Sequence, residues 1–289
     1  MKITPFTEVN KDVEKAAEWL SDMGLDFLIT RIGEYRKNIN LLVDLHEKGN
    51  YEEMNRLYPT LVNSLYEANE WIKIYRGLAF LKNQSLVKKL HDFLKGPEWF
   101  IDEKTSSASN RPRNVAFELL IASSVATNGI QPDFATHSDI AFPLGRKNIF
   151  IECKRPQSLS TIEKNIKSAT KQLKRRFQSA IRSNLRGIVA IDISKVSNPD
   201  FKMLEPQNTE SLDSYLTTTV TSFIDSFGYI WNRIKHRKII GLLVRFSGVA
   251  VIKNMNLLTY FQQWGLDPLS KRGSQDYQIA ERMGDILRG

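Results

Sequence analysis

The 289-residue sequence has one cysteine, Cys153, and four histidines that lie far apart. This excludes an intramolecular disulfide framework and a multi-cysteine zinc site. No apolar run approaches the roughly 18 residues that a membrane-spanning helix needs, so a membrane protein of that class is excluded too. The first residues show no basic segment followed by an apolar stretch. A signal peptide is therefore not predicted, and we expect a cytoplasmic protein without membrane partners.

The excess of positive charge belongs to one part of the chain. The formal net charge is +9. Residues 1–104 hold 15 Lys and Arg against 17 Asp and Glu, whereas residues 105–289 hold 26 against 15. This asymmetry predicts a polyanion, a nucleic acid, as the partner of the C-terminal part. A basic surface that is merely solvated is the alternative.

The hydrophobic pattern changes where the charge changes. Between residues 11 and 94, apolar residues recur at helical spacing with few breaks, which is typical of three to five helices. The small polar stretch Thr105–Asn110 is expected to be a linker. We therefore predict a helical N-terminal region over residues 1–104, serving interaction, dimerisation or substrate selection. A second domain is predicted over residues 105–289.

The second domain is expected to alternate helices and strands, an order typical of a mixed α/β fold. The expected elements are a buried helix at 115–126, strands at 139–142 and 149–153, a helix at 161–181, a strand at 187–193, a helix at 211–236, and strands at 239–246 and 249–252. Gly129 is expected to end the first of these helices.

The expected helix at 161–181 has an apolar face and a basic face, as placing its residues about 100° apart shows. Phosphate contacts along the basic face would make nucleic-acid binding salt-dependent. Solvation of that face is the alternative. The predicted nucleic-acid contacts are this face and two cations near the next motif: Lys147, Arg155, Lys164, Lys167, Lys171, Lys174 and Arg175.

An acid-x-Lys triplet, Glu152 to Lys154, ends an apolar predicted strand. Residues two apart on a strand point to the same side, so the carboxylate and the ammonium would lie together. Metal-dependent cleavage of a phosphodiester uses such a pair. Two other triplets of this kind, at 102–104 and 200–202, lie beside polar linker or turn residues and not on an apolar strand.

A second carboxylate is expected opposite the triplet. If the chain turns at Gly145 and Arg146, the register places Asp139 across from Glu152. Two facing carboxylates repel each other unless a cation lies between them, so a metal ion is expected there. The rival acid, Asp133, would need an earlier turn that interrupts an apolar run.

Glu118 is an isolated charge within the apolar run of the expected helix at 115–126. A charge in such a place should have a buried partner. A metal ion and an arginine such as Arg111 or Arg176 both remain open as that partner.

These residues and the order of their elements resemble the PD-(D/E)xK nuclease superfamily, with its restriction-endonuclease-like fold. The resemblance covers residues 110–193, at most to 252. The catalytic residues that it implies are Glu118, Asp139, Glu152, Lys154 and Gln172. Asp139 and Glu152 would bind Mg²⁺ or Mn²⁺ with help from Glu118, and Lys154 would orient or activate the water. Gln172 matches a polar helix position that some members use near the active site. The family's Pro-Asp pair falls at Pro132–Asp133 and not at Asp139.

The sequence thus predicts a metal-dependent nuclease acting on DNA. RNA remains an alternative substrate, because the charge pattern does not distinguish the two sugars. A non-catalytic nucleic-acid-binding or scaffolding protein with the same fold is the alternative from another class. All three acids and the lysine are present, which favours the enzyme. Defence against foreign DNA or DNA repair fits such a nuclease, with the N-terminal region forming a homodimer or binding a protein partner.

Overall fold

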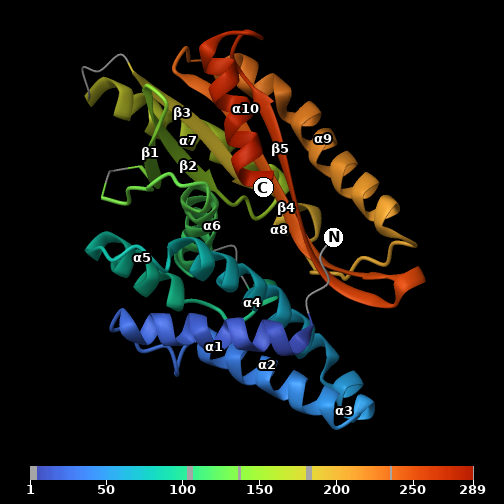
Figure 1. Ribbon diagram of the computed structural model, residues 1–289. Coiled ribbons are helices and arrows are strands. Elements are labelled where there is room, and N and C mark those ends of the chain that lie inside the picture. Colours follow the sequence, from blue (N-terminus) through green and yellow to red (C-terminus); the bar gives the residue numbers. More distant parts are fainter. Residues whose placement is uncertain (1–4, 103–106, 136–137, 180–183, 235, 289) are drawn as a thin grey trace. The chain divides into compact units, whose positions relative to one another are not determined.

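The computed structural model describes residues 5–102, 107–135, 138–179, 184–234 and 236–288 (Figure 1). The chain divides into two compact units, Met1–Ser123 and Ser124–Gly289. None of the helices in the described ranges is long and apolar enough to cross a membrane.

The first unit is helical, which confirms the prediction for the N-terminal region. Its helices are α1 (Phe6–Asp22), α2 (Arg31–Glu47), α3 (Tyr51–Arg56), α4 (Tyr58–Leu78), α5 (Gln84–Leu94), a 3₁₀ turn (Phe100–Asp102) and most of α6 (Ser107–Thr127). The side chains of Thr30 and Asn83 accept hydrogen bonds from the first turns of α2 and α5, as N-caps do. Helices α1, α2 and α4 pack against one another around buried aromatic residues that include Tyr35 and Trp71.

Helix α6 corrects the expected linker. Ser107–Asn110 form the first turn of the helix, whereas Thr105 and Ser106 lie outside the described residues. Small polar residues favour helix starts as well as loops, so their composition alone did not separate the two. The expected apolar helix and its stop are confirmed, because α6 ends at Thr127 and Gly129 has a left-handed φ of +74°. The two compact units divide within this helix.

The second unit contains a five-stranded sheet in the order β1-β2-β3-β4-β5. Its strands are β1 (Ile140–Leu144), β2 (Lys147–Lys154), β3 (Leu185–Asp192), β4 (Ile239–Ile252) and β5 (Leu257–Pro268). Strands β2, β3 and β4 run parallel, whereas β1 and β5 pair antiparallel at the two edges. The fold is therefore mixed α/β, as predicted.

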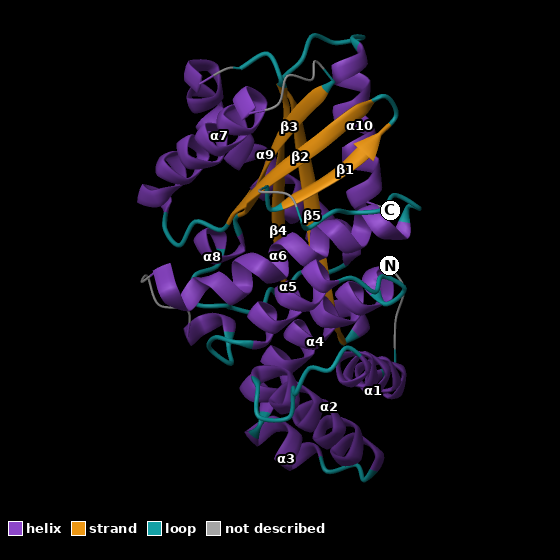
Figure 2. Cartoon of the chain, turned by 90° about the vertical axis from the view of Figure 1, so that its left-hand side faces the viewer, coloured by secondary structure: helices purple, strands orange, loops and turns teal. Residues whose placement is uncertain are grey.

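Helices cover both faces of this sheet. They are α7 (Ile162–Ser179), α8 (Ser194–Ser197), α9 (Thr209–Ile234) and α10 (Gln275–Arg288), with 3₁₀ turns at Leu159–Thr161 and Lys253–Met255. Figure 2 shows α7 beside β2 and β3, which it contacts. The predicted apolar face of α7 is buried in this layer, with Ile162, Ile166 and Leu173 inaccessible to solvent. A Cβ at Gly265 would meet α9, whereas the next residue, Leu266, faces α10, so these two helices cover opposite faces.

The last two strands differ from the prediction. The expected strands at 239–246 and 249–252 are one continuous strand, β4, with Ser247 and Gly248 inside it. Gly248 is not in a turn here. A Cβ at that position would lie 2.7 Å from the ring of Phe261, so glycine allows β5 to pack closely. Strand β5 and helix α10 were not predicted.

Candidate active site

The hairpin of β1 and β2 has the register that the sequence predicts. Ile140 pairs with Ile151, and Leu144 pairs with Lys147, so the chain turns at Gly145 and Arg146. Gly145 has a φ of +58°, a conformation that such a tight turn requires. Asp139 directly precedes the first of these pairs and is therefore level with Glu152.

The structure brings Asp139, Glu152 and Lys154 together. Lys154 Nζ lies 3.9 Å from Asp139 Oδ2 and 3.9 Å from Glu152 Oε2. Both distances are within reach of an ion pair but beyond a direct hydrogen bond. Asp139 Oδ2 also accepts a hydrogen bond of 2.7 Å from the backbone N–H of Cys153, which fixes this carboxylate against β2. The ammonium therefore lies between the carboxylate of Glu152 on β2 and that of Asp139, the residue just before β1.

The side chains of Asp139, Glu152 and Lys154 differ in how far they are buried. The side chain of Glu152 is 1% exposed, against 17% for Lys154 and 23% for Asp139. Glu152 and Lys154 pair with Val189 and Ile191 of β3, so they project toward the face that α7 covers. Two carboxylates and one ammonium leave a net charge of −1, and this favours an added cation.

The donor set suits a hard divalent cation. Mg²⁺ is commonly held by one or two carboxylates, with water and substrate phosphate oxygens completing its shell. Asp139 and Glu152 supply such a pair. In the described parts of the chain, no group of three Asp, Glu, His or Cys side chains is close enough to hold a metal ion. A metal ion here would therefore be coordinated by two protein carboxylates, with water or substrate supplying its other ligands.

Asp133, the rival acid, lies on the other side of β1. Its backbone N–H donates to Ala141 O at 2.7 Å, and its C=O accepts from Ala141 N at 3.0 Å, forming an isolated bridge. Its carboxylate accepts a hydrogen bond from the N–H of Ala135 and is exposed. This register supports Asp139, and not Asp133, as the partner of Glu152.

Glu118 belongs to the first unit, where it is buried in α6. Its carboxylate forms an ion pair with Lys89 of α5. Arg111, which the sequence suggested as a partner, instead pairs with Asp92 at 2.8 Å. The expected buried partner is thus a lysine, and a part for Glu118 in the metal site stays a prediction.

Gln172 lies on α7, the helix that packs against β2. Its Oε1 atom is buried and accepts no hydrogen bond from the described residues. A buried amide oxygen of this kind has an unused acceptor. The predicted role of Gln172 near the active site is compatible with this position but is not fixed by a contact.

The predicted nucleic-acid contacts fall into two groups. Lys164, Lys171 and Arg175 are exposed on the outer side of α7 as expected, and Lys167 is exposed beside Glu163, which it pairs with at 2.6 Å. The remaining three are partly or wholly buried: Lys147, Lys174 and Arg155. Lys147 begins β2, at the opposite end from Lys154. Arg155 is not on the surface, because its guanidinium is buried in an ion pair.

Sequence reasoning missed a buried charge network beside this site. Arg155 Nε donates to Asp192 Oδ2 at 3.2 Å, and Arg245 Nη1 donates to the same oxygen at 3.0 Å. Arg245 also donates to the hydroxyl of Tyr260 at 3.0 Å and to Gln262 Oε1 at 3.3 Å. The network joins the ends of β2 and β3 to β4 and β5. Because side chains alternate along a strand, it lies on the face opposite Lys154.

The carboxylate of Asp192 is held in its charged form. Burial by itself would raise the pKa of Asp192, but the guanidinium groups of Arg245 and Arg155 and hydrogen bonds from Ser194 outweigh it and lower that pKa. The signal for this network was present in the sequence. Asp192 and Arg245 each lie directly beside a run of apolar residues in the sequence, as Glu152 does.

No protein-family model matches this chain, and no curated protein sequence matches it. A function can therefore be inferred only from the residues of this chain and their geometry. The feature that points to a function is the ammonium held between two carboxylates at the end of β2.

Proposed function

We propose that this protein is a metal-dependent nuclease of the PD-(D/E)xK type, with a restriction-endonuclease-like domain that hydrolyses phosphodiester bonds of DNA. The observation that carries the proposal is the position of Lys154 Nζ, 3.9 Å from an oxygen of both Asp139 and Glu152. The order of α6, β1, β2, α7 and β3 supports it, because the resemblance implies the same order.

Each residue of the site has a role in this proposal. Asp139 and Glu152 would hold the cation, with Asp139 kept in place by the N–H of Cys153. Lys154 orients the attacking water and stabilises negative charge on the phosphate. A bound Mg²⁺ or Mn²⁺ would make a water molecule more acidic and offset charge on the phosphate oxygens. The burial of Glu152 strengthens these interactions, because little water screens them.

A cleavage assay tests this proposal. Linear, circular and single-stranded DNA, and RNA, are incubated with the protein in Mg²⁺, Mn²⁺ or EDTA. We expect metal-dependent cleavage that Glu152→Gln and Asp139→Asn abolish, because each removes one anionic ligand while keeping its shape. Asp133→Asn, the matched control at the exposed rival acid, should cleave like the unchanged protein. Equal cleavage by all variants would reject the site. Salt-sensitive binding without cleavage in any metal would favour the binding or scaffolding alternative.

The exposed basic face of α7 makes a separate prediction about binding. Replacing both Lys164 and Lys171 with Gln should lower the slope of log affinity against log salt by about two for duplex DNA, if each lysine neutralises one phosphate. The measurement is fluorescence anisotropy with a labelled duplex between low and moderate salt. Lys11→Gln with Lys88→Gln, two exposed lysines of the first unit, is the control. An unchanged slope would show that the α7 face is only solvated.

A further inference from the structure

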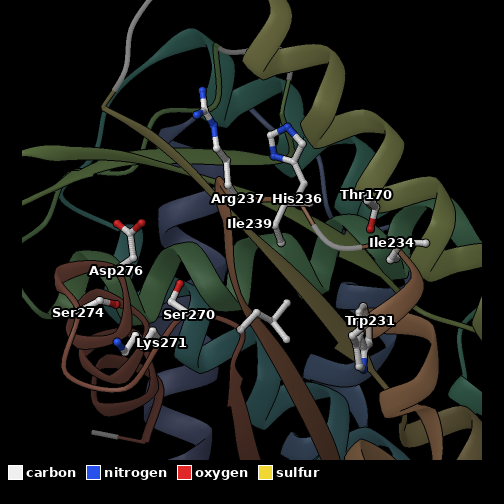
Figure 3. Close-up of a pocket in the computed structure, with 11 residues that line it drawn as sticks. Thr170, Trp231, Ile234, His236, Arg237, Ile239, Ser270, Lys271, Ser274 and Asp276 are labelled. Carbon is white, nitrogen blue, oxygen red and sulfur yellow. The ribbon is translucent and has the colours of Figure 1, made fainter.

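A cavity of about 320 Å³ lies at the end of the sheet where β4 begins and β5 ends (Figure 3). Ile239, the first residue of β4, lines it and pairs with Gly187 of β3. Glu152 and Lys154 lie further along the parallel strands, toward their carboxyl ends. The cavity is therefore separate from the candidate active site. Its volume is at the lower end of the roughly 300–1,000 Å³ typical of small-molecule sites.

The lining of the cavity has an apolar part and a hydroxyl-bearing part. Trp231 of α9 and Ile239 are buried and form apolar wall, while Thr170 and Ser270 contribute hydroxyl groups (Figure 3). Ser274, also in the lining, accepts a hydrogen bond of 3.2 Å from the N–H of Tyr277 at the start of α10. The N-terminal end of a 14-residue helix thus faces the cavity with its partial positive charge.

The charged groups around the cavity leave a positive excess. Arg237 and Lys271 are exposed at its rim, and neither forms an ion pair with any residue that the structure describes. Asp276 is the acid of the lining, but Arg186 already pairs with it at 2.7 Å. Since Arg186 already neutralises Asp276, the positive charges of Arg237 and Lys271 are left without a compensating acid in the lining.

His236, another residue of the lining, has a pKa that responds to these positive charges. Its ring stacks on Phe177 with centroids 5.2 Å apart, and its Nδ1 accepts the backbone N–H of Lys238 at 3.2 Å. Burial lowers the pKa of His236, and the nearby cations Lys174, Lys238 and Arg237 lower it further. Cations from α7 and from the loop before β4 thus lie close to the His236 ring. A further positive charge is disfavoured there, and an anion is favoured.

We propose that this cavity binds a nucleoside monophosphate, with the phosphate between Arg237, Lys271 and the N-terminus of α10, and the base against Trp231 and Ile239. A bare phosphate would leave the apolar wall unused, and a neutral nucleoside would leave the cations without a counter-charge. The phosphate monoester can come from a free nucleotide or from the 5′-phosphorylated end of a strand. The proposal does not depend on the nuclease activity.

Calorimetric titration of the full chain tests this site with adenosine 5′-monophosphate, adenosine and inorganic phosphate as probes. We expect the monophosphate to bind at least tenfold more tightly than either of the others. Arg237→Gln with Lys271→Gln should weaken it by at least tenfold. Arg272→Gln with Arg282→Gln, two exposed arginines outside the lining, should leave the affinity unchanged. Equal binding of adenosine, equal loss in both double variants, or no binding of the monophosphate would overturn the proposal.

Two further measurements refine the result. In proton NMR, the pKa of His236, assigned with His236→Asn, should rise when the monophosphate binds, because an anion then lies beside the ring. A constant pKa with binding intact would place the ligand elsewhere and reject the site. Competition with a tetranucleotide then separates the sources. Displacement by its 5′-phosphorylated form, and not by its 5′-hydroxyl form, identifies a strand end; no displacement by either identifies a free nucleotide.

Discussion

Replacing Lys154 with methionine is expected to lower the rate of metal-dependent cleavage by about 10²–10³-fold, the usual loss when one preorganised electrostatic group is removed. Methionine keeps most of the side-chain length but removes the ammonium that lies 3.9 Å from Asp139 and Glu152. Single-turnover cleavage with enzyme in excess measures the effect without product release. Lys202→Met is the control, because this exposed lysine lies outside the candidate site and outside the predicted nucleic-acid contacts.

A metal titration separates the role of Lys154 from damage to the site. Removing the ammonium leaves two carboxylates with one more unit of negative charge, so Mn²⁺ should bind more tightly to the variant. Tighter metal binding together with lost cleavage would assign Lys154 to the reaction itself. Unchanged cleavage in Lys154→Met would contradict the proposed mechanism, whereas no cleavage by the unchanged protein would contradict the proposed function.

Replacing Asp192 with asparagine is expected to lower the free energy of unfolding by about 3–5 kcal/mol, because it leaves the guanidinium groups of Arg155 and Arg245 buried without their carboxylate. Urea unfolding measures this change. Asp200→Asn is the control, since this exposed acid pairs with Lys202 on the surface and its replacement should change stability by less than about 0.5 kcal/mol. A loss for Asp192→Asn as small as that of the control would contradict the account of the network.

The pH dependence of stability gives this network a second signature. The pKa of Asp192 is lower in the folded chain than its ordinary value of 3.8. Its stabilising contribution is therefore complete above pH 3.8 and is lost as the pH falls through the lowered folded pKa. The unchanged protein should lose stability in that acidic range, whereas Asp192→Asn should lose less there. Unfolding curves at several pH values below 5 make the comparison.

Local patterns were sufficient for the hairpin that carries the acids. A two-residue turn at Gly145 and Arg146 sets the register of the whole β1–β2 pair, so one turn determines that Asp139 and Glu152 are level. A single carboxylate at the end of an apolar strand then marked the site. Asp139, the turn and Glu152 all lie within residues 139–152. At so short a separation, the sequence alone shows which residues of the two strands pair.

Other features depend on contacts that no local pattern contains. Asp192 and Arg245 are 53 residues apart, and they meet because β3 and β4 are neighbours in the sheet. Ser247 and Gly248 are typical turn residues, yet pairing with β5 and the ring of Phe261 keep them in a strand. Glu118 needed a partner, but nothing in its own helix indicated that Lys89 would be that partner. Tertiary context overrode local preference in each case.

Because β1 is at the edge of the sheet, the two acids of the candidate site are held by strands of different local stability. Glu152 and Lys154 lie on β2, which pairs with a strand on both sides. Asp139 lies just before a five-residue strand that pairs with β2 on one side and forms the isolated bridge to Asp133 on the other. Short edge strands open at lower free energy than interior strands. Asp139 is thus the acid that local fraying would withdraw first. A cation bound by both Asp139 and Glu152 would link the start of β1 to β2. Loss of that cation would therefore destabilise the β1 edge of the sheet before the other strands.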